Sequence, residues 1–214
     1  MIKTVSLKKE DCYCDLATFY ENVARKISAR ITDKSKFDRE VARKKIEHSL
    51  KRNFYWFGRE WPYKNVPARI IAEKYMSEDK NDTESTFNEI NGGLRDYKLY
   101  CFDGKVKLYL VTTDRSKGAT TGDYFDEQNR HLDLIWGFPN AKTIPDVPNN
   151  IEKMKELAEI LAAGIPQLRV DFYCIHDKVY FGELTFFDGS GFDEIEQECY
   201  RNLLGDYIKL PTLV

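Results

Sequence analysis

Hydrophobic and polar side chains alternate with a period of two along residues 96–102 and 105–111. This spacing predicts two β-strands, and the dipeptide Asp103-Gly104 between them is typical of a tight hairpin turn. A second hairpin is expected at about residues 168–187, where two apolar strands flank a short polar segment. Residues 69–76 are mostly apolar and predict a buried strand that ends in charged positions.

Two other stretches have the spacing of amphipathic helices. Hydrophobic residues recur about every four positions along residues 37–54, and Ser35 is a candidate cap for this helix. A second apolar stripe covers residues 151–161, with Asn150 before it and Gly164 after it. These boundaries are the ones that capping chemistry favours, so a helix is predicted between them.

Residues 112–150 contain many turn residues and few periodic ones, so a long loop is expected there. The resulting order is helix, strand, hairpin, loop, helix and hairpin. This mixed order predicts an α+β fold with a largely antiparallel sheet and packed helices. An alternating βαβ nucleotide-binding fold does not fit, because the chain has neither a G-x-G-x-x-G motif nor a Walker loop.

Composition narrows the class of protein. The 214 residues include 33 basic and 35 acidic side chains, so no overall positive field exists to capture nucleic acid. No apolar run approaches the length of a membrane span, and the N-terminus has no signal-peptide core. The five cysteines form no paired framework, which favours reduced thiols and a cytoplasmic protein.

Basic and aromatic residues interleave along residues 51–64. Such a mixture can stack nucleic-acid bases, and binding of that kind would depend steeply on salt. The alternative is an aromatic surface loop that folds onto its own domain. The near-neutral charge of the chain favours the loop, so no nucleic-acid partner is expected.

Two acidic residues, Asp171 and Glu183, lie within otherwise apolar strands. Desolvating a carboxylate without a partner is costly, so acids at these positions indicate either a compensating partner or a functional role. If residues 176–178 form the turn, Asp171 falls opposite Glu183, and a divalent cation could bind both. A two-residue turn would place them on opposite faces. Solvated acids, or a salt bridge to Arg169, are the alternative interpretation.

Five segments of the chain look familiar: Pro62-Tyr63-Lys64-Asn65, Ile70 to Met76, Asp96-Tyr97-Lys98, Trp136-Gly137-Phe138-Pro139-Asn140, and Arg169 to Phe192. Taken in order, they resemble the TupA-like ATP-grasp family over about residues 31–214. Residues 1–30 stay unassigned. Members of this family occur in bacterial surface-polysaccharide biosynthesis and are often labelled glycosyltransferases.

The resemblance implies an ATP- and Mg²⁺-dependent ligase, whose nucleotide lies between two lobes. Such enzymes activate a carboxylate as an acyl phosphate and join it to an amine. The adenine pocket is implied at Glu73, Lys74, Tyr75 and Met76. The main chain of Lys74 and Met76 would read the adenine edge, and Glu73 would lie near N6 or the ribose.

The resemblance also implies roles in the second hairpin. Asp171 and Glu183 match the two metal-binding acids, although Thr185 stands where many members have Asn. Arg169 would contact the transferred phosphate or the acyl group, and Lys98 would point toward phosphate. The small-residue loop would receive the substrate carboxylate through Gly189, Ser190 and Gly191.

The chain also departs from the family pattern. Members carry an upstream lobe with a glycine-containing loop over the phosphates, and this chain has no glycine before Gly58. A truncated domain is therefore expected, which lacks its N-terminal lobe or receives it from another chain. A non-catalytic remnant or binding module stays an alternative. A glycosyltransferase acting on a saccharide is another, but no D-x-D motif supports it. The expected ligands are a nucleotide and a small-molecule or saccharide substrate.

Overall fold

A computed structural model describes residues 38–70, 95–113, 120–175 and 177–210. The chain divides into two compact units, Met1–Ser77 and Glu78–Val214. Within the described ranges, no helix is both long and apolar enough to cross a membrane.

The first unit contains helix α2 (Arg39–Leu50), the short helix α3 (Tyr55–Gly58) and the 3-10 turn η2 (Trp61–Tyr63). Asp38 caps α2, because its Oδ1 atom accepts hydrogen bonds from the main-chain N–H groups of Glu40 and Val41. The expected cap, Ser35, is wrong: it lies outside the described residues, three positions before the observed cap.

The aromatic residues between 51 and 64 contact one another. Phe54 packs edge-on against Tyr63 at 5.6 Å, and Tyr55 packs edge-on against Trp61 at 6.2 Å. The ammonium of Lys64 lies 4.4 Å from the Trp61 ring centroid, within the range of a cation–π contact. These contacts show that the aromatic and basic side chains of this segment pack against one another.

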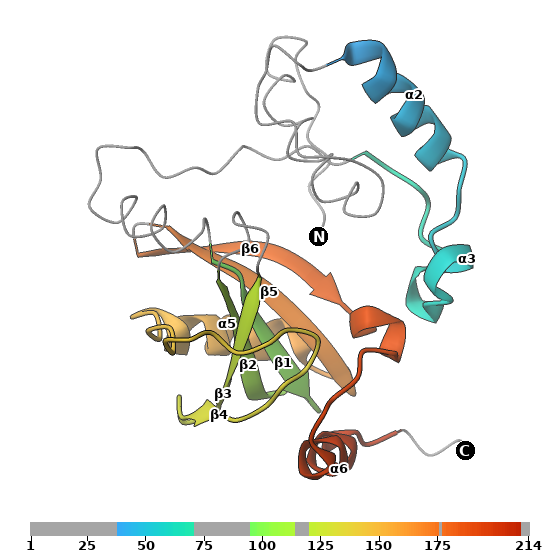
Figure 1. The fold of residues 1–214 in the computed structure, drawn as a ribbon. Coiled ribbons are helices and arrows are strands. Elements are labelled where there is room, and N and C mark those ends of the chain that lie inside the picture. The colour runs from blue at the N-terminus through green and yellow to red at the C-terminus, as the bar shows by residue number, and fades with distance from the viewer. Residues whose placement is uncertain (1–37, 71–94, 114–119, 176, 211–214) are drawn as a thin grey trace, which may run out of the picture. The chain divides into compact units, whose positions relative to one another are not determined.

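The second unit contains a six-stranded sheet in which every pair of neighbouring strands is antiparallel (Figure 1). The strand order is β4-β3-β2-β1-β5-β6. Both turn residues between β1 and β2, Asp103 and Gly104, have positive φ angles, as a type I′ hairpin requires. The predicted hairpin is therefore confirmed. The strands are β1 (Tyr97–Phe102), β2 (Lys105–Thr113), β3 (Thr121–Asp126), β4 (His131–Leu132), β5 (Gln167–Ile175) and β6 (Lys178–Thr185).

The prediction of a long loop at residues 112–150 is wrong, because β3 and β4 lie within it. Acidic residues in β3 conceal the strand pattern, but each has a partner. Asp123 is buried and lies 3.0 Å from His131 Nε2. Asp126 Oδ1 accepts from the main-chain N–H groups of Gln128 and Arg130 and so closes the β3–β4 turn.

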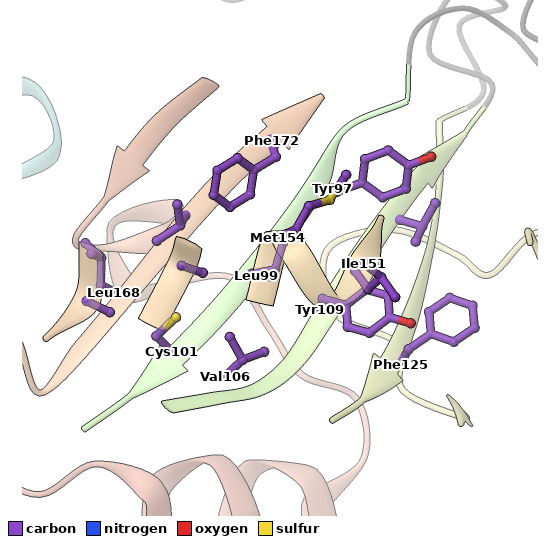
Figure 2. Close-up of a cluster of buried hydrophobic side chains, with 14 residues drawn as sticks. Tyr97, Leu99, Cys101, Val106, Tyr109, Phe125, Ile151, Met154, Leu168 and Phe172 are labelled. Carbon is purple, nitrogen blue, oxygen red and sulfur yellow. The ribbon is translucent and has the colours of Figure 1, made fainter. Parts of the chain in front are cut away.

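The two faces of the sheet pack against different helices. Helix α5 (Ile151–Ala162), which agrees with the predicted helix, covers one face. Met154 of α5 lies among side chains from the strands, including Leu99 and Phe172 (Figure 2). Helix α6 (Glu198–Tyr207), which the sequence pattern did not predict, contributes Leu204 to the core of the other face.

The register of the β5–β6 hairpin differs from the expected one. Ile175 pairs with Lys178, so two residues separate the strands instead of three. A bulge follows: Val170 pairs with Leu184 and Phe172 with Phe181, so Asp171 faces both Gly182 and Glu183. This one-residue shift offsets the shorter turn and returns Glu183 to the face that carries Asp171.

Candidate functional site

A cluster of charged side chains occupies the sheet face that lies away from α5. On β1, Tyr97 and Leu99 belong to the α5 core, so Lys98 between them faces the other side. Lys98 pairs with Asp171 across the β1–β5 ladder, and its ammonium donates a hydrogen bond to Asp171 Oδ2. The pairing of β1 with β5 therefore places a lysine directly against one of the predicted acids.

Arg169 lies at the centre of this cluster and is bound by three carboxylates. Its Nε and Nη2 atoms donate to the two oxygens of Asp171 at 2.8 and 2.9 Å, which is a bidentate ion pair. Nη2 also donates to Glu183 Oε1 at 3.0 Å, and Nη1 donates to Asp188. The side chains of Arg169 and Asp171 are only 8% and 5% exposed. We call Lys98, Arg169, Asp171, Glu183 and Asp188 the charged cluster.

Burial and pairing act in opposite directions on the two cations of the charged cluster. Burial is the largest single effect on Arg169 and disfavours its charge, but Asp171 and then Asp188 together outweigh it, so the pKa of Arg169 is raised. For Lys98, burial is the larger effect and Asp171 offsets only part of it, so its pKa is lowered. Arg169 therefore keeps its positive charge, whereas the protonation of Lys98 depends on the nearby carboxylate of Asp171.

Glu183 is the most solvent-accessible acid of the charged cluster, with 63% of its side chain exposed. Its carboxyl group nevertheless lies against Arg169. The pKa of Glu183 is raised, first by loss of water around the carboxyl group and then by the nearby charge of Asp171. A cation placed between Asp171 and Glu183 would relieve this repulsion.

The small-residue loop begins next to the charged cluster. It forms the 3-10 element η4 (Asp188–Gly191), in which Gly189, Ser190 and Gly191 all have φ angles between 54° and 78°. Gly189 has a φ angle of 54°, which favours glycine, and a Cβ atom there would lie 2.2 Å from the carboxylate of Asp193, so this side chain would have to move. Ser190 is a non-glycine residue held in the left-handed region, a form of strain that clusters at functional sites.

Sequence reasoning missed two residues of this site. The hydroxyl of Tyr100 donates a 2.6 Å hydrogen bond to Asp188 Oδ2, and Asp188 bonds to Arg169 through its other oxygen. Tyr100 follows Lys98 by two positions on one strand, so a shared face was the available signal. Asp188 gave no signal, because its contact depends on where the end of β6 directs the chain.

The donor set fits a Mg²⁺ ion that is also bound by a substrate. In the described part of the chain, no three His, Cys, Asp or Glu side chains are grouped so as to hold a metal by themselves. Asp171 and Glu183 supply two adjacent carboxylates that both contact Arg169 Nη2. Mg²⁺ commonly uses one or two carboxylates and completes its shell with water and phosphate oxygens. Thr185, which pairs with Arg169, is the next β6 residue on the same face.

The remaining residues that the sequence nominated lie outside this description. Glu73, Lys74, Tyr75 and Met76, the expected adenine contacts, fall in the undescribed range 71–94. All five residues of the charged cluster belong to β1, β5, β6 and η4 of the second unit.

An antiparallel sheet with a helix on one face and this cluster on the other agrees with the ATP-grasp class expected from the sequence. The family model described as TupA-like ATPgrasp matches residues 28–209, and the chain belongs to this family. No match was found among curated proteins or among solved structures.

Proposed function

We propose that this protein is an ATP- and Mg²⁺-dependent ligase that activates a carboxylate as an acyl phosphate and joins it to an amine. We further propose that it serves cell-surface polysaccharide biosynthesis. Family membership supports the reaction class. The observation that carries the proposal is the pairing of β1 with β5, which brings Lys98 and Arg169 together with Asp171 on one sheet face.

Each residue of the charged cluster has a proposed role that follows from its chemistry. Asp171 and Glu183 would hold Mg²⁺, which supplies neutralisation of phosphate charge when bound. Lys98 and Arg169 would bind the transferred phosphoryl group, since phosphoryl transfer depends mainly on positioning and charge neutralisation. The main-chain N–H groups of Gly189, Ser190 and Gly191 would receive the substrate carboxylate or the oxyanion formed from it.

The proposed reaction has two steps, formation of an acyl phosphate and its attack by an amine. A substrate carboxylate oxygen attacks the γ-phosphorus of ATP, the bond to the β–γ bridging oxygen breaks, and ADP leaves. The amine then attacks the carbonyl carbon of the acyl phosphate, inorganic phosphate leaves, and the amine loses a proton. Glu73, Lys74, Tyr75 and Met76 stay the proposed adenine contacts, on the resemblance alone.

Calorimetric titration of the purified chain with ATP, with and without Mg²⁺, tests the proposal. We expect Mg²⁺-dependent binding that Glu183→Gln weakens at least about tenfold, because the variant loses one of two charged metal ligands. Glu159→Gln is the matched control, since Glu159 bonds to Lys105 and to the main chain of Val106, outside the charged cluster. Absence of ATP binding by protein shown to be folded would overturn the proposal.

A further inference from the structure

The guanidinium of Arg169 is almost fully occupied by carboxylates of its own chain. Among the described residues, carboxylate oxygens accept from four of its five N–H groups. Asp171 takes the side-on edge formed by Nε and Nη2. Glu183 and Asp188 bond to Nη2 and Nη1, the two nitrogens of the end-on edge. An incoming phosphate or carboxylate can therefore bind this edge in bidentate fashion only after these two acids move.

The charges in the cluster also oppose a free anion. Three carboxylates surround two cations, and a fourth carboxylate, Asp96, lies 3.5 Å from the Lys98 ammonium. A bare phosphate would meet both occupied N–H groups and an excess of negative charge. A phosphate that arrives with a divalent cation would meet less negative charge and a freed Nη2, because Asp171 and Glu183 then share their charge with that cation.

Tyr100 keeps Asp188 in place. Tyr100 is 1% exposed, and its ring contacts Trp136 at 4.9 Å and Tyr124 at 6.1 Å between centroids. Its hydroxyl donates to Asp188 Oδ2, so this carboxylate is held from the sheet side while its other oxygen bonds to Arg169. A buried tyrosine held by two rings is a rigid anchor for an acid at the start of a loop.

We propose that Asp188 is a specificity-determining residue that excludes free anions from the end-on edge of Arg169. The Nη2 end of this edge becomes available to a phosphate that brings a divalent cation, once Glu183 has a metal partner in place of Nη2, while Asp188 keeps the Nη1 end. Tyr100 is the positioning residue that holds Asp188 for this role. The inference rests on the proposed function for the identity of the accepted ligand, and the exclusion of metal-free anions stands on the charged cluster itself.

The test measures binding of inorganic tripolyphosphate by calorimetry in the presence of EDTA. Asp188→Asn removes one negative charge at hydrogen-bond distance from Arg169 and keeps the shape of the side chain. We expect it to bind tripolyphosphate at least about tenfold more tightly than the unmodified chain. Tyr100→Phe keeps the buried ring and loses only the hydroxyl, so it should shift affinity in the same direction by a smaller factor.

Two controls separate this effect from general ones. Glu159→Gln changes the net charge of the chain by the same amount outside the charged cluster and should leave tripolyphosphate affinity unchanged. Asp188→Ser replaces Asp188→Asn if the latter does not give the circular dichroism spectrum of the unmodified chain. No gain in either Asp188 variant, or an equal gain in Glu159→Gln, overturns the proposal.

A parallel titration with ATP and Mg²⁺ separates the two hypotheses. Suppose that the unmodified chain does not bind ATP, but Asp188→Asn binds tripolyphosphate more tightly than the unmodified chain does. This result would reject the proposed nucleotide-binding function and support the proposal that Asp188 excludes free anions. Suppose instead that the unmodified chain binds ATP with Mg²⁺, but Asp188→Asn and the unmodified chain bind tripolyphosphate equally in EDTA. This result would support the proposed function and reject the proposed role of Asp188.

Discussion

The carbonyl oxygen of Asp171 lies 3.0 Å from the position that a Cβ atom would take on Gly182. A Cβ atom at this distance from main-chain atoms would require the bulge to shift by a few tenths of an ångström, so the bulge that aligns Asp171 with Glu183 favours glycine. We predict that Gly182→Ala lowers the free energy of unfolding by about 1–3 kcal/mol. Denaturant unfolding measures this loss, and calorimetry should show weaker Mg²⁺-dependent ATP binding, because Glu183 is displaced.

Gly205 provides the matched control for this substitution. It lies exposed in α6, and a Cβ atom there would meet nothing within 4 Å. Gly205→Ala should raise the free energy of unfolding by up to about 1 kcal/mol, since alanine favours helices. Equal stability of the Gly182→Ala variant and the unmodified chain would show that the bulge does not need glycine.

The second prediction concerns the bidentate pair of Arg169 and Asp171. Arg169→Ala would leave a buried carboxylate facing Lys98 alone, and breaking a buried pair costs about 3–5 kcal/mol. Thermal or denaturant unfolding measures the loss. Lys105→Ala breaks a largely exposed pair with Glu159 and should cost less than about 1 kcal/mol. Similar losses in both variants would contradict the central place of Arg169.

The third prediction concerns pH. Burial lowers the pKa of Lys98, so the unfolded chain holds this proton more tightly than the folded one. The contribution of Lys98 to stability therefore rises as pH increases from the lowered pKa toward the ordinary lysine value. Competitive acylation, followed by peptide mass spectrometry, should find Lys98 titrating below the ordinary lysine pKa. Asp171→Asn should lower the Lys98 pKa further, and a rise would contradict this assignment.

The fourth prediction concerns Cys101. Burial, and secondarily the Glu159 charge, raises the pKa of this thiol to about 12. Because the thiolate is the reactive form, Cys101 should resist a thiol reagent at pH 8 in the folded protein and react after unfolding. Of the three cysteines within the described residues, the exposed Cys199 should react first. Modification of both residues at one rate would show that the α5 core opens readily.

Local chemistry decided which elements could be predicted from the sequence. Asp103-Gly104 specifies a hairpin by itself, because both residues tolerate positive φ angles. Strand β3 could not be found in this way, since the partner of Asp123 is His131 on the next strand. The contact between Asp123 and His131 depends on tertiary structure, so the sequence pattern of residues 121–126 does not predict it.

The candidate site shows the same division. Asp171 and Glu183 were nominated as a same-face pair, but through a turn one residue longer than the observed one. The bulge that restores the pairing depends on close contact between two strands. Its one sign in the sequence is Gly182. Asp188 could not be predicted as a site residue, because nothing near it in the sequence indicates that its partners are Arg169 and Tyr100.

The pairing of β1 with β5 also has a consequence for the folding pathway. Lys98 and Asp171 are 73 residues apart in sequence, so their contact closes a long loop, whereas the β1–β2 and β5–β6 hairpins close locally. Non-local pairings form slowly because closure entropy must be overcome first. The two hairpins should therefore form early and join late, so that a nascent or partly folded chain cannot present the charged cluster before its central strands have met.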